Sequence, residues 1–249
     1  MITFYFSGTG NSKYIAELFA QNTNSACLSI DEKTDFSEII AQHGTIAFCY
    51  PIYGSCVPRI MREFVSSISQ LLHGKKIIIF CTQFLFSGDG ARAFSRLLPS
   101  EQCTVIYTEH FRMPNNISNF ALFPIAGAEK QKKYFMRAEK KMKTVCENIE
   151  KGIVKKRGFS FGSRLLGILQ NSHFPAVERK AAKDVRVRES CIGCGVCVKI
   201  CPMDNLSLEN KTIKPKGNCT LCYRCVNICP NKSITVLVHG KVRKQYRRI

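Results

Sequence analysis

The sequence predicts an α/β chain: a doubly wound, five-stranded parallel sheet followed by a small α+β module rich in cysteine. Apolar strand-like runs alternate with amphipathic helical stretches through the first 150 residues, which is typical of a parallel sheet covered by helices. Eight of the 14 cysteines fall after residue 190. We therefore expect a sheet domain over residues 1–150, a helical linker over 151–185 and a cysteine-rich domain over 186–249.

The strands are predicted where β-branched and aromatic residues run together. These runs occupy residues 2–6, 26–30, 45–50, 76–82 and 104–111. Amphipathic segments between and after them predict helices near residues 12–21, 35–42, 58–72, 90–98 and 129–151. Five strands separated by helices suit the strand order 2-1-3-4-5.

A turn of small and hydroxyl-bearing residues, Ser7-Gly8-Thr9-Gly10-Asn11-Ser12, follows the first strand. At a strand-to-helix turn the backbone N–H groups are free, which predicts a phosphate cradle. A dinucleotide fingerprint would need a third glycine at Lys13, and a Walker loop would need a glycine just before that lysine. The turn favours a ligand with a single phosphate, and an empty turn is the plain alternative.

At these residues the chain resembles the flavodoxins, whose phosphate loop reads Thr/Ser-x-Thr-Gly-x-Thr/Ser. Ser7, Thr9, Gly10, Asn11 and Ser12 match it, and the resemblance implies FMN as the ligand. In that family the isoalloxazine ring lies at the carboxyl ends of the third and fourth strands. The residues there that become candidate FMN contacts are Pro51, Tyr53, Gly54, Thr82, Gln83, Phe84 and Gly88.

Within these loops the resemblance implies that Tyr53 stacks on the flavin and that the peptide of Gly54 turns to bond the reduced ring. The chain has no tryptophan. Phe84 or Phe86 would therefore have to replace one wall of the usual aromatic sandwich. The plain alternative is that Tyr53, Phe84 and Phe86 are core residues.

Two cysteine runs with the same spacing lie 28 residues apart, Cys191-x-x-Cys194-x-x-Cys197-x-x-x-Cys201-Pro202 and Cys219-x-x-Cys222-x-x-Cys225-x-x-x-Cys229-Pro230. They resemble the signature of bacterial ferredoxins with two [4Fe-4S] clusters. In such ferredoxins the fourth cysteine of each run serves the other cluster. The resemblance therefore implies one ligand set of Cys191, Cys194, Cys197 and Cys229, and a second set of Cys219, Cys222, Cys225 and Cys201.

Zinc knuckles and a disulfide framework are the competing interpretations of the cysteines. Zinc sites come as paired rather than triple Cys-x-x-Cys runs, and disulfides need an oxidising compartment. No signal segment precedes the first strand, and no apolar stretch approaches about 18 residues. We therefore expect a soluble, cytoplasmic protein, and low-potential clusters would suit an anaerobic host.

The chain is basic, with a net charge of +19. The region 186–249 has 13 basic and 3 acidic residues, a net charge of +10. A positive surface beside redox centres predicts acidic redox partners of the ferredoxin or flavodoxin type, or ferredoxin-dependent enzymes. The basic tail from Lys241 to Arg248 resembles a polyanion-binding run, but no nucleic-acid-binding motif accompanies it, so we expect no specific nucleic-acid partner.

Residues 159–174 form a patchy apolar stretch with basic neighbours. It could dock the cysteine-rich domain, cover the flavin or lie on a membrane surface, and interdomain packing is the commoner role.

In domain order the chain resembles the fused flavodoxin/ferredoxin proteins of anaerobic bacteria. That resemblance implies an electron relay between two [4Fe-4S] clusters and FMN, acting as a carrier that interconverts one- and two-electron steps. The alternatives are a reductase whose FMN reduces a small molecule, and a redox sensor. We expect cofactor ligands rather than catalytic acid–base residues, and a homodimer is possible.

Overall fold

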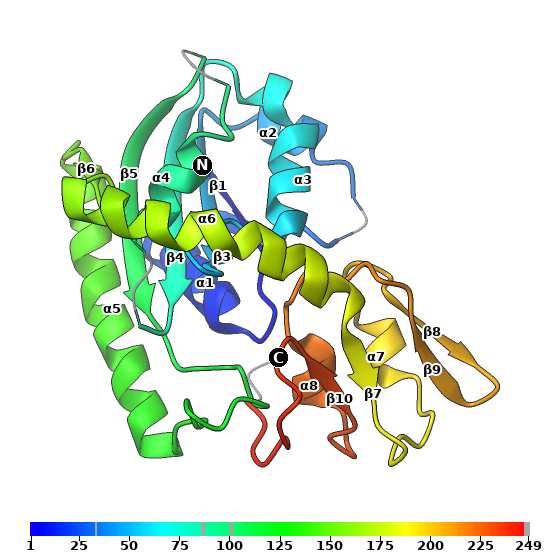
Figure 1. Ribbon diagram of the computed structural model, residues 1–249. Helices are drawn as coiled ribbons and strands as arrows, with labels where there is room; N and C mark the ends of the chain where they lie inside the picture. Colours follow the sequence, from blue (N-terminus) through cyan, green and yellow to red (C-terminus); the bar gives the residue numbers. More distant parts are fainter. Residues whose placement is uncertain (33, 86–87, 100–101, 247–249) are drawn as a thin grey trace. The chain divides into compact units, whose positions relative to one another are not determined.

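The computed structural model describes residues 1–32, 34–85, 88–99 and 102–246 (Figure 1). Its contacts divide the chain into two compact units. The first, the sheet unit, comprises Met1–Ser7, Asn11–Met113 and Glu129–Phe174. The second, the cysteine unit, comprises the remaining segments Gly8–Gly10, Pro114–Ala128 and Pro175–Ile249.

A parallel sheet of six strands in the order β2-β1-β3-β4-β5-β6 forms the centre of the sheet unit. The strands are β1 Ile2–Tyr5, β2 Ala26–Ser29, β3 Thr45–Pro51, β4 Lys76–Gln83, β5 Thr104–Arg112 and β6 Lys155–Lys156. The doubly wound parallel fold and the order of the first five strands are confirmed. The strand β6, which pairs with Tyr107 and Thr108 of β5, was not predicted, because two lysines carry no apolar pattern.

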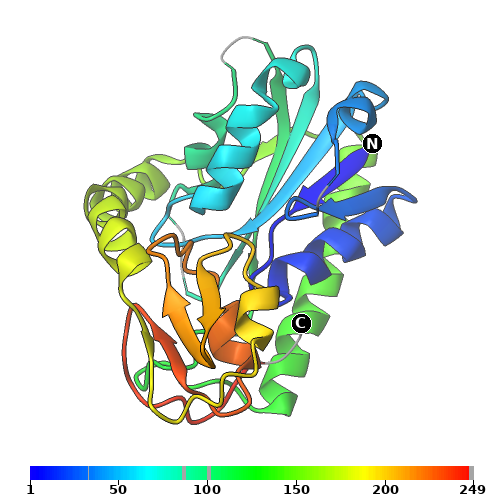
Figure 2. The same cartoon turned by 90° about the vertical axis from the view of Figure 1, so that its right-hand side faces the viewer.

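Helices cover both faces of this sheet, as Figure 2 shows for α3 in cyan and for α1 and α5 in blue and green. Successive strand residues point to opposite faces, so Ala47 and Cys49 of β3 join the core beneath α1 and α5. Phe48 and Tyr50 instead pack on Phe94. The helices are α1 Asn11–Asn22, α2 Ser37–Ala41, α3 Arg59–Ser67, α4 Gly90–Ser95 and α5 Ala128–Glu150.

The observed helices differ from the predicted ones mainly at their ends. The segment predicted as one helix over 58–72 is α3 followed by a separate 3₁₀ turn, η1 Ser69–Leu72. The break falls at Ile68, whose φ of −103° and ψ of 5° are not helical. The helix α4 ends at Ser95, three residues before the predicted limit.

A long helix, α6 Phe161–Lys183, contains Pro175, the residue at which the contacts divide the two units. Its first part, to Phe174, belongs to the sheet unit and reaches the loops that follow β3 and β4. None of the helices in the described ranges is both long and apolar enough to cross a membrane.

The cysteine unit contains two small antiparallel sheets and two short helices. Its strands are β7 Val185–Val187, β8 Leu206–Glu209, β9 Thr212–Pro215 and β10 Ile234–Val236, and its helices are α7 Val196–Lys199 and α8 Arg224–Ile228. β7 pairs with β10, and β8 pairs with β9. The β8–β9 hairpin turns on Asn210 and Lys211, both with positive φ, as a two-residue turn of this kind requires.

Candidate cofactor sites

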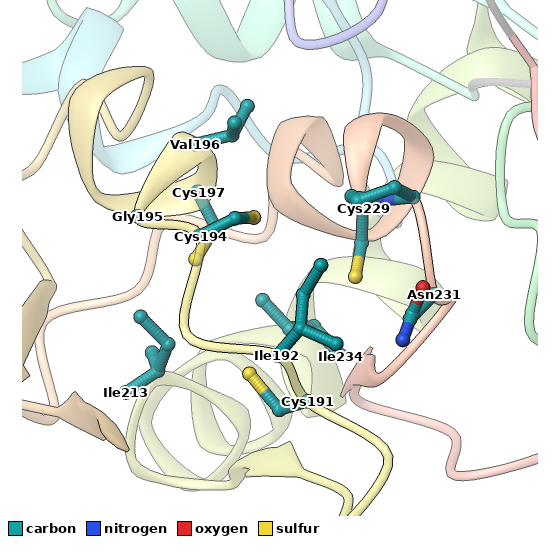
Figure 3. A pocket seen from close by; sticks show the side chains of 11 residues that line it. Cys191, Ile192, Cys194, Gly195, Val196, Cys197, Ile213, Cys229, Asn231 and Ile234 are labelled. Carbon is teal, nitrogen blue, oxygen red and sulfur yellow. The ribbon is translucent and has the colours of Figure 1, made fainter. Parts of the chain in front are cut away.

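The cysteines of the two runs line two cavities of the cysteine unit. The four cysteines of the first cavity are Cys191, Cys194, Cys197 and Cys229. The four of the second are Cys219, Cys222, Cys225 and Cys201. Figure 3 shows the first set around a common space, with three cysteines from one run and the fourth from the other. The structure thus brings together the same two sets of four that the resemblance implies.

The two runs share one backbone conformation, offset by 28 residues. Gly193 and Gly195 have φ of 64° and 73°, and their counterparts Leu221 and Tyr223 have φ of 59° and 62°. After the prolines, Asp204 and Lys232 also match, with φ of 47° and 53°. Because left-handed backbone costs a non-glycine residue about 1 kcal/mol or more, its recurrence indicates a loop shape that both sites require.

Backbone N–H groups donate to sulfur at three of these cysteines. Asn205 donates to Cys201 Sγ over 3.3 Å, and its counterpart Ser233 donates to Cys229 Sγ over 3.2 Å. Leu221 donates to Cys219 Sγ over 3.3 Å. Such bonds stabilise a negatively charged thiolate, which is the form that binds iron.

As free thiols, two of these cysteines are poor acids. Burial, followed by the nearby Cys229 and Cys191, raises the pKa of Cys197 to about 11. Burial and the adjacent Cys222 and Cys219 raise the pKa of Cys225 well above its usual value. A cationic metal centre would reverse this preference, because a coordinated thiol loses its proton.

The residues therefore suit iron–sulfur clusters in their donor atoms and surroundings. The first cavity has an apolar wall that includes Ile192, Ile213 and Ile234, and shielding of this kind limits solvent access to a cluster. Within the described residues, no three His, Cys, Asp or Glu side chains come close enough to hold a single metal ion.

The predicted phosphate turn lies between β1 and α1, and all its residues are buried. Ser12 and Thr82 share a hydrogen bond of 2.7 Å between their hydroxyls. The hydroxyl of Thr9 accepts a 2.7 Å bond from Asn116 Nδ2, so its own proton stays available for donation. Gly10 has a φ of 94°, a conformation that favours glycine. The turn fits a phosphate group at the N-terminus of the 12-residue helix α1.

The predicted ring contacts lie at the ends of β3 and β4. Pro51 ends β3, Thr82 and Gln83 end β4, and Phe84 follows half-buried. Gln83 Oε1 is buried without a hydrogen-bond partner among the described residues. A buried oxygen without a donor suits a flavin as its partner, because the flavin ring carries an N–H donor. Phe86, the other candidate wall, lies outside the described residues.

After β3, Tyr53 forms an isolated bridge with Cys56. Gly54 has a φ of 54°. A Cβ at Gly54 would lie 2.5 Å from the ring of Phe174 in α6, so the position has no room for a side chain. Its glycine is therefore required both by conformation and by the approach of α6.

The first part of α6 packs on these same loops. Ser55 Oγ donates to Gln170 Oε1, and Cys56 Sγ donates to Asn171 Oδ1 over 2.7 Å. A Cβ on Gly88 would lie 2.9 Å from the backbone nitrogen of Gly167. Residues 159–174 were expected to dock the cysteine-rich domain, to cover the flavin or to lie on a membrane. The contacts within the sheet unit support the second role, because α6 covers the loops assigned to the flavin.

Sequence reasoning missed two asparagines of the cysteine unit. Asn116 bonds Thr9, and Asn227 Nδ2 donates to the backbone oxygen of Asn116 over 3.0 Å. Asn227 is fully buried on α8 and also accepts from Ser118 Oγ and from the backbone of Tyr246. Neither asparagine belongs to a periodic pattern, and only the turn-like Pro114-Asn115-Asn116 could have drawn attention to the first.

Two protein-family models match this chain. The family model described as a flavodoxin domain matches residues 2–154, and the model described as a 4Fe-4S dicluster domain matches residues 190–233. A comparison with curated proteins found no match.

Two solved structures illustrate the similarity of this chain to known proteins. Two-electron reduced flavodoxin of Megasphaera elsdenii is 22% identical over 56% of this chain and 99% of its own, with a TM-score of 0.41. General stress protein 14 of Treponema denticola, in complex with FMN, is 13% identical over 59% of this chain and 96% of its own, with a TM-score of 0.43. Because the flavodoxin model covers more than half of the chain, this protein belongs to the flavodoxin domain family and carries a C-terminal 4Fe-4S dicluster domain.

Proposed function

We propose that this protein is a cytoplasmic electron carrier in which two [4Fe-4S] clusters of the cysteine unit exchange electrons with FMN bound at the turn between β1 and α1 and at the loops after β3 and β4. A flavodoxin domain and a 4Fe-4S dicluster domain in one chain support an electron-transfer role. The observation that carries the finer proposal is the convergence of two complete sets of four cysteines on two separate cavities.

When bound, clusters pass single electrons and FMN accepts one or two, so together they interconvert one- and two-electron steps. The chain supplies the ligands and their surroundings. Two of the N–H···S bonds fall on Cys201 and Cys229, the cysteines that cross between the runs, and such bonds raise the reduction potential of a cluster.

The proposal assigns the FMN phosphate to the turn from Ser7 to Ser12, and the ring to the loops after β3 and β4. The hydroxyls of Thr9 and Ser12 and the first N–H groups of α1 would hold the phosphate. Gln83 Oε1 would accept from the ring, and Tyr53 would pack against it. The first part of α6 would limit access of water to the ring.

The partners that suit this carrier are acidic redox proteins. The charge of +10 over residues 186–249, from 13 basic and 3 acidic residues, would steer a negatively charged protein toward the cysteine unit. Exchange with such a partner should slow as salt rises, because exposed charges are screened beyond a distance of about 8–10 Å at physiological salt.

A reductase that acts on a small molecule is the second candidate. It is favoured by one specific observation: residues from 155 to 166 line an open pocket of the sheet unit beside Gln83 and Gly88. A carrier needs no such pocket, whereas an enzyme needs a place for its substrate.

An anaerobic reductive titration of cofactor-replete protein tests the carrier proposal. Two one-electron clusters and a two-electron FMN predict uptake of about four electrons per chain, with both absorbance signals changing. Uptake of about two electrons without a flavin signal would contradict it.

Ser12→Ala should weaken FMN binding about tenfold, by loss of one hydroxyl donor to a charged phosphate. Ser67→Ala is the matched control, because Ser67 lies at the end of α3 and its hydroxyl donates to the backbone oxygen of Phe64 in the same helix. Equal FMN affinity in the two variants would argue against the proposed phosphate site.

A further inference from the structure

The sheet unit contains an open pocket of about 580 Å³ that neither the phosphate turn nor the cysteine runs explain. Its walls come from the ends of β4 and β5, from β6 and from the beginning of α6. Sites for small molecules in proteins commonly measure about 300–1,000 Å³. The pocket therefore has room for a ligand of metabolite size.

Three consecutive basic residues, Lys155, Lys156 and Arg157, line this pocket. Two of them also bind the buried Glu109: Lys155 Nζ lies 2.9 Å from its carboxylate and Arg157 Nε lies 3.3 Å away. Lys141 adds a third ion pair of 2.9 Å. Burial pushes the pKa of Glu109 upward, but hydrogen bonds from Lys141 and Lys155 outweigh it and hold the pKa below its usual value.

The single charge of Glu109 cannot balance this group. Lys141, Lys155, Lys156 and Arg157 carry four positive charges against one negative charge, which leaves a surplus of three. Lys156 forms no ion pair with any residue that the structure describes. Pairing with Glu109 explains the other three cations, but it gives no reason for Lys156 to stand at the pocket beside them.

Uncharged hydrogen-bonding groups complete the lining. Ser160 and Ser163 stand at the start of α6. The hydroxyl of Ser160 accepts from the backbone N–H of Ser163 over 3.3 Å and donates to Ser163 Oγ over 2.9 Å, which leaves the hydroxyl proton of Ser163 for a ligand. A Cβ at Gly162 would meet nothing within 4 Å, so the space beside this first helical turn is open.

His110 lines the pocket from β5 and is only 4% exposed. Burial, with a further contribution from Arg157, lowers its pKa to about 4. His110 is therefore neutral at neutral pH and offers a hydrogen bond rather than a charge.

We propose that this pocket binds a small organic anion that carries phosphate or carboxylate groups. Surplus positive charge, the hydroxyl of Ser163 and the start of α6 meet at one cavity, and this combination suits an anion with several oxygen atoms. Gln83 and Gly88 also line the pocket. A bound anion would therefore lie next to the ring only if FMN binds as proposed above, whereas anion binding itself does not depend on FMN.

Isothermal titration calorimetry on the full-length, cluster-containing protein tests this inference. Pyrophosphate and citrate serve as separate probes, each titrated into FMN-free and FMN-loaded protein. We expect at least one of them to bind with a stoichiometry of one in both forms. In Lys156→Gln the dissociation constant of that probe should rise about tenfold, the effect of losing one charge-assisted hydrogen bond.

Lys140→Gln is the matched control. Lys140 is an exposed lysine of α5 that does not line the pocket, so its loss removes the same net charge elsewhere on the sheet unit. Equal weakening in the two variants would mean general attraction to a basic protein and would overturn the proposal. Absence of binding by both probes would overturn it as well.

FMN loading separates the pocket from the flavin site. If FMN abolished probe binding, the pocket would be part of the FMN site and the proposal would be wrong. If the protein bound no FMN at all, the proposed function would fail, and the titrations of the FMN-free form would still decide whether the pocket takes an anion.

Discussion

The two cysteine runs reach the same backbone conformation with different residues. The first places Gly193 and Gly195 at its two left-handed positions, whereas the second places Leu221 and Tyr223 at the equivalent ones. Ligand spacing is identical in the two runs. The comparison shows that the cysteine arrangement fixes the backbone, while the surroundings of each loop decide which side chain is tolerated.

Space explains the difference. A Cβ at Gly193 would collide with the backbone oxygen of Lys211 in the β8–β9 hairpin, so no side chain fits there. Leu221 and Tyr223 are only 3% and 4% exposed. Burying a side chain of that size contributes about 2 kcal/mol, which offsets a left-handed strain of about 1 kcal/mol.

The largest effect is expected from removing single cysteines, which tests whether each run serves one cluster or both. Cys197 and Cys201 belong to the same run, but they line different cavities. We expect Cys197→Ala and Cys201→Ala each to lose about half of the bound iron, because a cubane needs four protein ligands. The reduced protein should then show a different remaining cluster in each variant by electron paramagnetic resonance.

Two further variants serve as internal controls for that assignment. Cys229→Ala should reproduce the spectrum of Cys197→Ala, and Cys225→Ala should reproduce that of Cys201→Ala. FMN content should stay constant in all four. Identical spectra for Cys197→Ala and Cys201→Ala would show that each run serves one cluster alone.

The next effect comes from exchanging the residues at the first left-handed position. Leu221→Gly removes strain but empties a buried site, so we expect a net loss of about 3 kcal/mol. Gly193→Ala adds a methyl group against a backbone oxygen, and we expect a similar loss of about 2–4 kcal/mol. The temperature at which cluster absorbance disappears measures both, and an unchanged temperature for Gly193→Ala would show that the β8–β9 hairpin can move away.

Much of this fold could be predicted because its elements carry strong local patterns. The five predicted strands agree with β1 to β5 within about one residue at either end, since Ile, Val and Phe mark them clearly. The edge strand β6 was missed because Lys155 and Lys156 carry no apolar strand pattern, and the ion pair of Lys155 with Glu109 cannot be read from the sequence. The helical linker expected over residues 151–185 contains α6, but the contacts of α6 with Gly54 and Gly88 could not be predicted, because they depend on tertiary approach.

The candidate sites also divide into those with a local sequence motif and those that depend on tertiary contacts. The candidate cluster ligands and the candidate phosphate turn could be recognised in the sequence, because the residues of such motifs recur at fixed spacing. Asn116, Asn227 and the basic pocket were not, because their roles arise from pairings over long separations, such as Lys155 with Glu109. A lysine in a run of basic residues has the same sequence pattern on a solvated surface and at a ligand site.

A smaller effect is expected at the second glycine of the first run. A Cβ at Gly195 would lie 3.5 Å from a methyl group of Leu208, an ordinary contact. Gly195→Ala should therefore cost only the left-handed strain, about 1 kcal/mol. The same thermal measurement checks this, and a loss as large as that of Gly193→Ala would mean that strain, rather than space, explains the glycines.

The smallest effect concerns the hydroxyl that only the second run carries. Tyr223 Oη donates to the backbone oxygen of Val236 over 2.9 Å, and Asn119 Nδ2 donates to the same oxygen over 2.9 Å. Tyr223→Phe should therefore cost only about 0.5–1 kcal/mol, because the buried oxygen keeps two partners, Asn119 and the backbone N–H of Val238 at 2.7 Å. Adding Asn119→Ala still leaves the backbone N–H of Val238 as a donor to that oxygen, so the losses of the two single variants should add in the double variant. A double variant that loses more than the sum, measured by the temperature of cluster loss, would mean that the two side-chain donors act together and that the backbone bond does not compensate for them.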